Sequence, residues 1–297
     1  IRTLVLGEYM FDNTMDNQLK FLISARMGGV YKNNENINVE IAVTPSLTDS
    51  LYSGSTKLLA LPSSLYTLSS TSTITIPSGK FDGGIEVTLN DAFLDDPLAF
   101  RLNYVIPLKI LSSTTDSVLE GRTSNTSPDP RIAGNWITVP KNFTLFGIQF
   151  VNKYHGRYLL RGVDVRMDVA NVPIDTITYR NKFVERSAVV SVSTEGRNAV
   201  SYSNSVRLKT GSPGSFKMLI DFDASGNAVI AKYTGSAFDF TNATAKFVND
   251  GDEWGGSKRE AIYLDYIIVD GANYHHCKDT LVFRDKGVTY AQYSPVI

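Results

Sequence analysis

Apolar and polar residues alternate along most of the chain with a period of two. Val39, Ile41 and Val43 fall on one side of such a segment, and Glu40 falls on the other. Successive side chains of a β-strand point to opposite faces, so this alternation predicts strands that cover a core with one face. Helical periodicity is scarce, and only residues 90–100 have room for a helical turn or two. The same alternation recurs in residues 85–90, 200–209, 217–222 and 262–268.

Short clusters of Gly, Pro, Asn, Asp and Ser separate the predicted strands. Glycine adopts positive φ freely and Asn and Asp tolerate it, which is why these residues form tight turns. Connections this short favour antiparallel neighbours. The clusters lie at residues 77–79, 82–84, 211–214, 224–227 and 250–252.

A polar stretch with little periodicity divides the chain near residues 112–135. We interpret residues 114–135 as a connecting segment that partly drapes over one domain. Residues 1–113 contain six or seven predicted short strands, which suits an immunoglobulin-like sandwich. Residues 136–297 contain eight or nine longer strands in succession, which suits a meander closed into a barrel without free edges. The predicted fold class is therefore all-β, with a sandwich followed by an antiparallel barrel.

Composition narrows the classes of partner. The 29 basic and 30 acidic residues give a net charge of -1, so we expect no nucleic-acid partner. Cys277 is the single cysteine, which rules out an intramolecular disulfide. No stretch approaches the roughly 20 apolar residues that span a bilayer. Ile1 begins directly within a predicted strand, so we expect any signal peptide or lipid anchor to lie outside this sequence.

The N-terminal half resembles a domain of unknown function from Bacteroidetes. The resemblance rests on Met27–Asn33, the strand Val39–Val43, the pair Ile74–Gly79 and Ile85–Leu89, and the closing strand Tyr104–Ile110. In that family the domain is immunoglobulin-like. It occurs in surface lipoproteins and beside glycoside hydrolase domains.

The C-terminal half resembles the domain that often follows it. The matching motifs are Asn152–Tyr158, Gly251–Gly256 and His275–Arg284. That family is similar to lipocalin-like (calycin) barrels. The resemblance implies an outer-membrane, cell-surface lipoprotein encoded with SusC/SusD-type glycan uptake systems. It supplies no established functional residues.

The sequence offers no convincing catalytic set. A glycosidase needs paired carboxylates, one of them with a raised pKa. The acidic clusters Asp95–Asp96 and Asp250–Glu253 lie in turn-like settings, where solvated loops are expected. A Ser-His-Asp site would have to use His155, His275 or His276, and no Gly-x-Ser-x-Gly elbow is present. We therefore expect no enzymatic activity.

The segment His275–His276–Cys277 is a weak candidate for a zinc site. In a strand His275 and Cys277 share a face and His276 points away. A third ligand would have to come from elsewhere, and nothing places His155 nearby. The favoured interpretation is that these histidines form hydrogen bonds inside the barrel or at its rim.

A partial calcium-loop match at Asp221–Gly226 also fails. Lys232 occupies the position of the bidentate Glu, and the flanking residues alternate as strands. A hairpin turn is the favoured interpretation. We expect no metal and no cofactor.

Trp254 is the best candidate for a ligand platform. Sugars bind with their C–H faces on aromatic rings, while charged and amide groups bond the hydroxyls. The local set of Trp254, Glu253, Asp252 and Arg259 offers those groups. The alternative is that Trp254 plugs one end of the barrel with its indole N–H bonded locally. Trp136 is interpreted as a packing anchor between the domains.

Three functions remain open. The favoured hypothesis is a non-catalytic, cell-surface carbohydrate-binding lipoprotein that captures polysaccharide or oligosaccharide beside SusC/SusD-type proteins. The alternatives are a glycosidase or esterase accessory enzyme, and a structural or adhesive surface module without a glycan site. An open groove with an aromatic floor would favour the first function, and a carboxylate pair in a cleft would favour the second.

Overall fold

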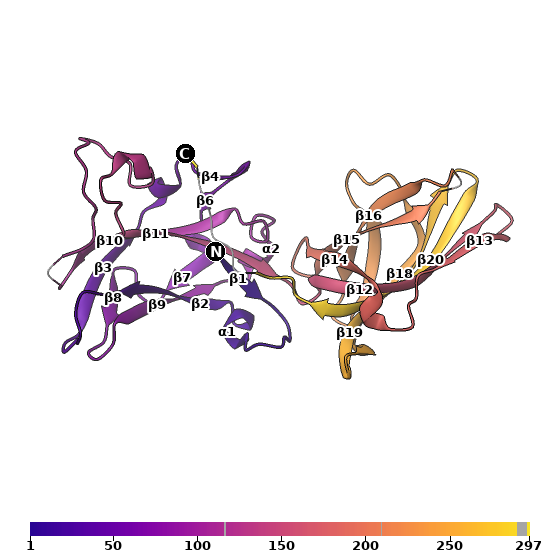
Figure 1. The fold of residues 1–297 in the computed structure, drawn as a ribbon, viewed down its shortest axis with the longest axis horizontal. Coiled ribbons are helices and arrows are strands. Elements are labelled where there is room, and N and C mark those ends of the chain that lie inside the picture. Colours follow the sequence, from indigo (N-terminus) through magenta and orange to yellow (C-terminus); the bar gives the residue numbers. More distant parts are fainter. Residues whose placement is uncertain (116, 209, 290–295) are drawn as a thin grey trace. The chain divides into compact units, whose positions relative to one another are not determined.

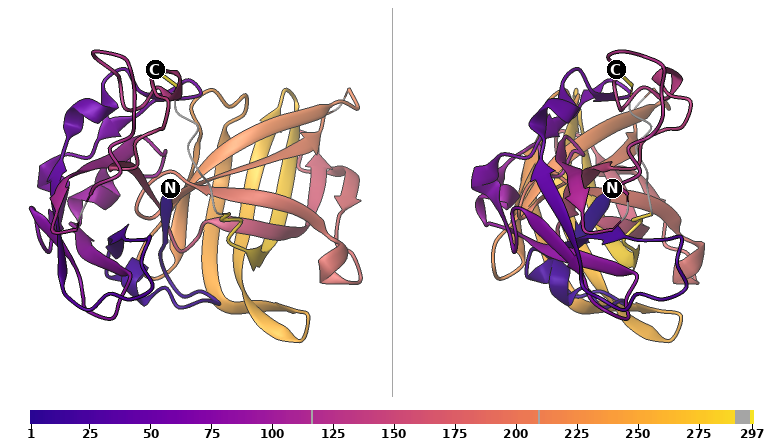
Figure 2. Two further views of the ribbon diagram at one scale, coloured as in Figure 1. Left: turned by 60° about the vertical axis from the view of Figure 1, so that its left-hand side comes forward. Right: turned by 90° about the vertical axis from the view of Figure 1, so that its left-hand side faces the viewer.

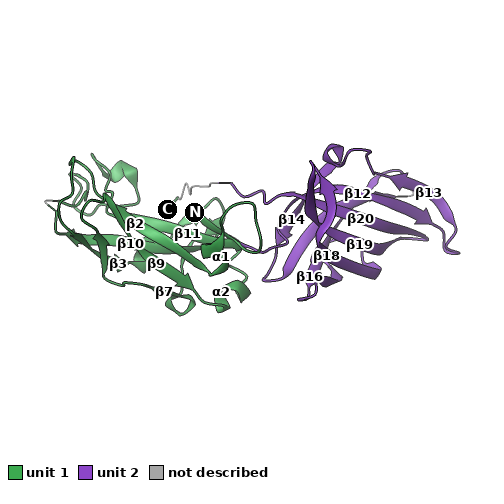
Figure 3. Cartoon of the chain, turned by 90° about the horizontal axis from the view of Figure 1, so that it is seen from below, with its two compact units in different colours: residues 1–150, 290–297 green, residues 151–289 purple. Residues whose placement is uncertain are grey.

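The computed structural model describes residues 1–115, 117–208, 210–289 and 296–297. The chain forms two compact units (Figure 3). One comprises Ile1–Phe150 and Tyr290–Ile297, and the other comprises Val151–Thr289. Strands are by far the commonest regular structure, with 53% of the residues against 7% in helices, which confirms the predicted all-β fold class.

The first unit is a sandwich of two sheets (Figure 1). The larger sheet has the order β1-β11-β10-β3-β8, and β6 pairs with β10 off this path. Its strands are β1 (Arg2–Val5), β11 (Phe143–Val151), β10 (Tyr104–Ser113), β3 (Ile37–Val43), β8 (Thr73–Ile76) and β6 (Leu59–Ala60). The smaller sheet contains β2 (Lys20–Arg26), β9 (Asp82–Leu89) and β7 (Tyr66–Leu68).

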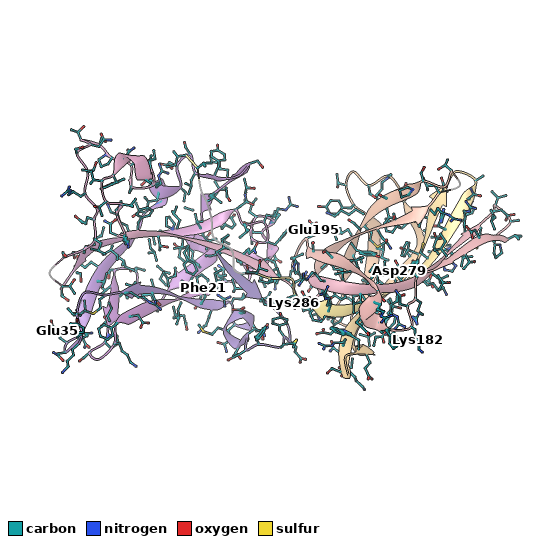
Figure 4. The ribbon with its side chains drawn as sticks, in the orientation of Figure 1. Phe21, Glu35, Lys182, Glu195, Asp279 and Lys286 are labelled. Carbon is teal, nitrogen blue, oxygen red and sulfur yellow. The ribbon has the colours of Figure 1, made fainter. Side chains whose placement is uncertain are left out.

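Both sheets contribute their apolar faces to one core. Val39 and Ile41 of β3 are buried whereas Glu40 is exposed, as the alternation predicted. Phe21 of β2 stacks on Phe146 of β11 with 5.3 Å between the ring centroids, which joins the two sheets (Figure 4 labels Phe21). The period of two in the sequence therefore translates directly into a two-layer core.

The boundary between the units differs from the predicted one. Residues 143–151 were assigned to the barrel, but they form β11, which pairs with β10 from Tyr104↔Ile148 to Lys109↔Phe143. The first unit therefore extends to Phe150 rather than ending at residue 113. The polar stretch that was interpreted as a connecting segment leaves this sheet after β10 and returns to it at β11.

Residues 117–142, called the excursion below, fold against the first unit. Arg131 donates to the main-chain oxygens of Leu47 and Asp49. Trp136 was expected to pack between the domains, but its indole nitrogen donates to the Asp129 carbonyl within the excursion at 2.8 Å. The excursion thus belongs to the sandwich.

The second unit is a closed, eight-stranded antiparallel barrel (Figure 2). Consecutive strands are neighbours from β14 to β20, and β12 pairs with both β14 and β20 to close the barrel. This is the predicted meander. Its strands are β12 (Gly156–Met167), β14 (Ala188–Thr194), β15 (Ala199–Arg207), β16 (Pro213–Phe222), β17 (Asn227–Lys232), β18 (Phe240–Trp254), β19 (Ser257–Asp270) and β20 (Asn273–Asp285). β13 (Pro173–Thr178) pairs with the second half of β12.

The remaining elements are short. α2 (Ala92–Asp95) lies in the segment that was expected to hold a helical turn. The described residues contain no helix with both the length and the apolarity needed to cross a bilayer. The other short elements are α1 (Thr14–Asn17), η1 (Pro45–Thr48), η2 (Ser63–Leu65), η3 (Ala133–Asn135), η4 (Val184–Arg186) and the pair β4 (Tyr52–Ser53) and β5 (Thr56–Lys57).

Two bulges bend β18 and set the shape of the barrel wall. The pairing of β18 with β19 shifts between Thr241 and Thr244 and again between Val248 and Asp252. Asn242 and Asp250, inside the two shifts, have positive φ values of 47° and 53°. Asn and Asp tolerate this conformation better than other non-glycine residues. A bulge bends its strand, so the end of this hairpin, residues 251–259, leaves the direction of the wall.

Candidate functional site

An open groove of about 720 Å³ runs along the outer face of the barrel. It crosses β12, β20, β19, β18 and β17, and the end of β13 borders it. The strand register shows which side of the wall it occupies. On β19, Ile262, Leu264 and Tyr266 are at most 2% exposed and point into the barrel, so Tyr263 and Asp265 between them point outward into the groove.

Strand pairing aligns the outward side chains in two rows, which define the outer groove. Neighbouring strands lie about 4.8 Å apart, so a row across five strands is roughly 19 Å long. The first row consists of Arg161, Thr280, Tyr263, Lys246 and Asn227, each opposite the next. The second row consists of Thr178, Val163, Lys278, Asp265 and Thr244.

Tyr263 is the aromatic residue on the floor of the outer groove. Its side chain is 38% exposed, and its hydroxyl donates to the Gly251 carbonyl on the bent end of β18. Burial, and then the nearby carboxylate of Asp252, raise the pKa of Tyr263, whereas Arg180 acts in the opposite direction. The phenol is thus neutral. Its ring is fixed at one end by attachment to the β19 backbone and at the other by the hydrogen bond from its hydroxyl to Gly251.

Asp265 is the carboxylate of the second row. It accepts from His276 Nε2 at 2.6 Å and from Lys278 Nζ at 3.2 Å. Partial burial favours a higher pKa, but these hydrogen bonds and charges outweigh it and hold the pKa of Asp265 below its ordinary value. Asp265 is therefore an ionised group that Lys278 balances in charge and His276 holds by a hydrogen bond.

The four residues that the sequence proposed as a ligand site lie on one hairpin, where Asp252 is opposite Arg259, but their side chains have different partners. Trp254 and Arg259 meet, with the guanidinium carbon 4.7 Å from the ring centroid. The indole nitrogen of Trp254 donates to the Phe283 carbonyl at 2.9 Å. One face and the polar edge of Trp254 thus have partners within the protein.

Asp252 turns instead towards the outer groove, where Arg161 donates to it at 3.2 Å. Glu253 is exposed and lies opposite Lys258. Only Asp252 of the four therefore approaches the rows of the outer groove. A role for these four residues in ligand binding stays a prediction.

A buried carboxylate organises the inside of the barrel. Asp279 is 2% exposed and accepts from Tyr266 at 2.8 Å, Tyr202 at 3.2 Å and Tyr179 (Figure 4 labels Asp279). Burial raises the pKa of Asp279, and these hydrogen bonds oppose the shift. Gly162 makes room, because a Cβ there would lie 2.6 Å from Asp279 Oδ1 and 2.8 Å from the Tyr179 ring. This part of the interior is closely packed.

Beside Asp279 lies a group that resembles a catalytic triad in composition. His275 Nδ1 is 3.0 Å from Asp164, and Cys277 is the next residue on the same inward face. His276 points outward, which confirms the predicted alternation. Burial, and then the charges of Asp164 and Asp279, raise the pKa of the Cys277 thiol. The thiolate needed for nucleophilic attack is therefore disfavoured.

Two further basic groups of the second unit are removed from solvent, one of them fully buried and the other partly. Lys286 is 1% exposed and donates to the Lys153 carbonyl at 2.6 Å, and burial lowers its pKa to about 8 (Figure 4). His155 Nδ1 accepts from the Thr194 amide at 3.1 Å, and burial, followed by the charge of Lys286, lowers its pKa to about 4. His155 is thus neutral at physiological pH. The described residues contain no group of three or more His, Cys, Asp or Glu arranged to hold a metal ion.

The first unit has a hollow of about 690 Å³ under the excursion. Its strongest polar groups already have protein partners. Arg131 pairs with Asp129 at 2.7 Å and also binds two carbonyls, and the Trp136 indole N–H is bonded. The outer groove is therefore the better candidate for a ligand.

Comparison with known proteins shows which families and solved structures this chain resembles. Residues 153–287 match a family model described as a domain of unknown function, DUF5627, and residues 1–117 match one described as a "-like, N-terminal domain". The solved structure of a Bacteroides ovatus protein of unknown function is 35% identical, with a TM-score of 0.92 over 99% of this chain and 95% of that chain. The chain belongs to the family of that protein.

Two other solved Bacteroides ovatus structures are more distant. One, of unknown function, is 14% identical with a TM-score of 0.48 over 98% of this chain and 93% of that chain. The other bears the name "putative carbohydrate binding protein" and is 13% identical with a TM-score of 0.32 over 96% of both chains. Neither is similar enough to support an argument about this chain. No match was found among curated proteins.

Sequence reasoning missed the outer groove, although one signal for it was present. The alternation of residues 262–268 places Tyr263 on the outward face, and an outward aromatic residue in an otherwise regular strand is a candidate for binding. Its companions could not be found in this way. Arg161 and Thr280 reach the same row only through strand pairing over long sequence separations.

Proposed function

We propose that this protein is a non-catalytic glycan-binding protein and that the outer groove holds the saccharide. The observation that carries the proposal is the fixed ring of Tyr263 on the floor of an open groove about 19 Å long. The C–H face of a sugar can stack on such a ring, and neighbouring amide and charged side chains can bond its hydroxyls. A few well-placed polar groups around an apolar floor are typical of small-molecule sites.

The acidic groups near the groove do not suit glycoside hydrolysis. That reaction needs two carboxyl groups across the scissile bond, one of them protonated near neutral pH. Asp265 instead has a lowered pKa, an ion pair with Lys278 and a hydrogen bond with His276. Asp279 points inward and its oxygens are occupied by tyrosine hydroxyls. These settings support a binding role.

The thiol chemistry of an esterase is also disfavoured. Cys277 is 1% exposed, and its thiol is held protonated. A buried thiol of raised pKa behaves as a packing residue rather than a nucleophile. We further propose, from the family resemblance stated above, that the protein acts as a cell-surface lipoprotein of the outer membrane. Its partners would be SusC/SusD-type proteins of a polysaccharide uptake system.

The test is a binding screen of the purified protein against plant, host and fungal polysaccharides, followed by Tyr263→Ala. Loss of a stacking ring costs roughly 1–3 kcal/mol by analogy with bases on aromatic platforms, so affinity should fall about tenfold or more. Tyr31→Ala is the matched control, because Tyr31 is a fully exposed tyrosine of the first unit. We expect it to bind as the parent does.

Thermal melting should show that both variants are folded. Failure of every glycan to bind the parent would contradict the proposal and favour a structural or adhesive role. Equal affinity of Tyr263→Ala and the parent would place the glycan elsewhere. Turnover of any polysaccharide or acyl ester by the parent would contradict the non-catalytic assignment.

A further inference from the structure

We infer that the outer groove selects glycans that carry negative charge, as carboxylate or sulfate groups. This inference rests on the proposed function, because it names the class of glycan for the same groove. It follows from the arrangement of charged side chains around Tyr263, which the next paragraphs develop.

The charges that line the groove do not balance. Arg180, Lys246 and Lys278 supply three cations, and Asp265 supplies the outward-facing anion among the lining residues. Asp265 is already paired, since its carboxylate forms an ion pair with Lys278 and a hydrogen bond with His276. An ionised carboxylate that already has a cationic partner and a further hydrogen bond has little remaining attraction for other cations. The groove therefore has an excess of positive charge.

Two of these cations form no ion pair with an acidic residue in the part of the chain that the structure describes. Among the described residues, neither Arg180 nor Lys246 forms an ion pair with Asp or Glu. The other lining cation, Lys278, does form one. Because neither side chain is paired with a carboxylate of the described residues, Arg180 and Lys246 remain available for a ligand.

Arg180 and Lys246 lie on opposite sides of Tyr263. Lys246 is the direct cross-strand partner of Tyr263. Arg180 follows Tyr179, whose amide bonds the Gly162 carbonyl, so Arg180 comes level with Arg161 at the far end of the same row. Its charge reaches Tyr263, where it opposes the rise of the tyrosine pKa.

This geometry suits an anionic sugar better than a neutral one. A sugar ring stacked on Tyr263 would have a guanidinium on one side and an ammonium on the other. The planar fork of Arg180 matches the geometry of a carboxylate or sulfate, and Lys246 acts as a point charge. The cations also attract an anionic polymer from solution, an effect that salt screens over about 10 Å at 0.1 M.

The experiment compares polymers that share a sugar backbone and differ in whether that backbone carries charged groups. Polygalacturonate is set against its fully methyl-esterified form, and dextran sulfate against dextran, with binding measured by calorimetry at low and high salt. We expect at least one charged member to bind about tenfold or more tightly than its neutral counterpart, and added salt to weaken that member alone. The two pairs also distinguish carboxylate from sulfate as the group recognised.

Charge-removing variants locate the effect. Arg180→Gln and Lys246→Gln should each weaken binding of the charged polymer about threefold to tenfold, and leave any binding of the neutral polymer unchanged. Lys232→Gln is the matched control. It removes the same charge from β17 outside the groove, where Lys232 pairs with Asp239 at 3.4 Å, and it should bind as the parent does.

The outcomes separate this inference from the proposed function. Equal binding of neutral and charged polymers, with loss of affinity in Tyr263→Ala alone, would overturn the inference and keep the glycan site. Equal losses in Lys232→Gln, Arg180→Gln and Lys246→Gln would show non-specific attraction and also overturn it. Absence of glycan binding altogether would end both proposals.

Discussion

The hydroxyl of Tyr263 on β19 donates a hydrogen bond to the main-chain carbonyl of Gly251 on β18, twelve positions earlier in the chain. This bond exists because the bulge between Val248 and Asp252 turns the end of β18 over the outer wall. Gly251 itself packs on that wall, where a Cβ would lie 2.9 Å from Ala261 Cβ. The orientation of the Tyr263 ring thus depends on both the bulge and Gly251.

The first prediction concerns Gly251→Val. The added side chain has no room against Ala261, so we expect a loss of about 1–3 kcal/mol in unfolding free energy, seen as a lower melting temperature. Displacement of the backbone at residue 251 should also break the hydrogen bond between the Tyr263 hydroxyl and the residue 251 carbonyl, and so weaken glycan binding. Gly196→Ala is the control, because its Cβ would meet Ala199 Cβ at an ordinary 3.5 Å. A Gly251→Val protein as stable as the parent would disprove the packing argument.

The second prediction concerns Trp254→Ala. This change removes the hydrogen bond to the Phe283 carbonyl and the contact with Arg259, so we expect about 1–3 kcal/mol of destabilisation in thermal or urea unfolding. An unchanged melting temperature would show that these contacts contribute nothing.

Trp254→Phe separates packing from ligand binding, because it keeps an aromatic ring and loses the N–H donor. If Trp254 also serves as a sugar platform, Trp254→Ala should lose about tenfold in glycan affinity while Trp254→Phe retains most of it. If Trp254 only packs, both variants should bind the glycan as the parent does once they are folded.

The third prediction concerns pH and His155. Its Nδ1 accepts from the Thr194 amide and therefore needs a free lone pair, and burial and Lys286 lower its pKa from 6.5 to about 4. The unfolded chain binds the proton more readily. The unfolding free energy is therefore unaffected by this group above pH 6.5. It decreases by at most about 3 kcal/mol as the pH falls from 6.5 to about 4.

His155→Asn tests this assignment, since the Asn oxygen can accept from Thr194 and does not titrate. Urea unfolding midpoints measured across this pH range should fall less steeply with acid for His155→Asn than for the parent. Parallel pH profiles for the two proteins would rule out His155 as the titrating group.

The fourth prediction concerns Cys277, the single cysteine of the chain. Burial and neighbouring carboxylates keep its thiol protonated, so a chromogenic thiol reagent should not label the native protein at neutral pH. In guanidinium chloride it should label one thiol per chain. Rapid labelling of the native protein would show that the barrel opens readily around β20.

The alternation of side chains was enough to predict the barrel and the faces of its strands. It placed His275 and Cys277 on one face and His276 on the other, and it identified Asp221–Gly226 as a hairpin turn, where Asp223 accepts from the Ser225 and Asn227 amides. These are local properties of the backbone. The position of β11 was predicted wrongly, because its alternation fits a strand of either unit.

The sequence by itself determined that Tyr263 points away from the core, since the period of two is a property of each strand alone. Only the tertiary structure decided that Arg161, Thr280 and Lys246 share its row. The reason is physical. Strand pairing joins residues that are far apart in the chain, and the register depends on bulges and turns that no single segment encodes. A groove assembled across five strands therefore cannot be located from the sequence of any one strand.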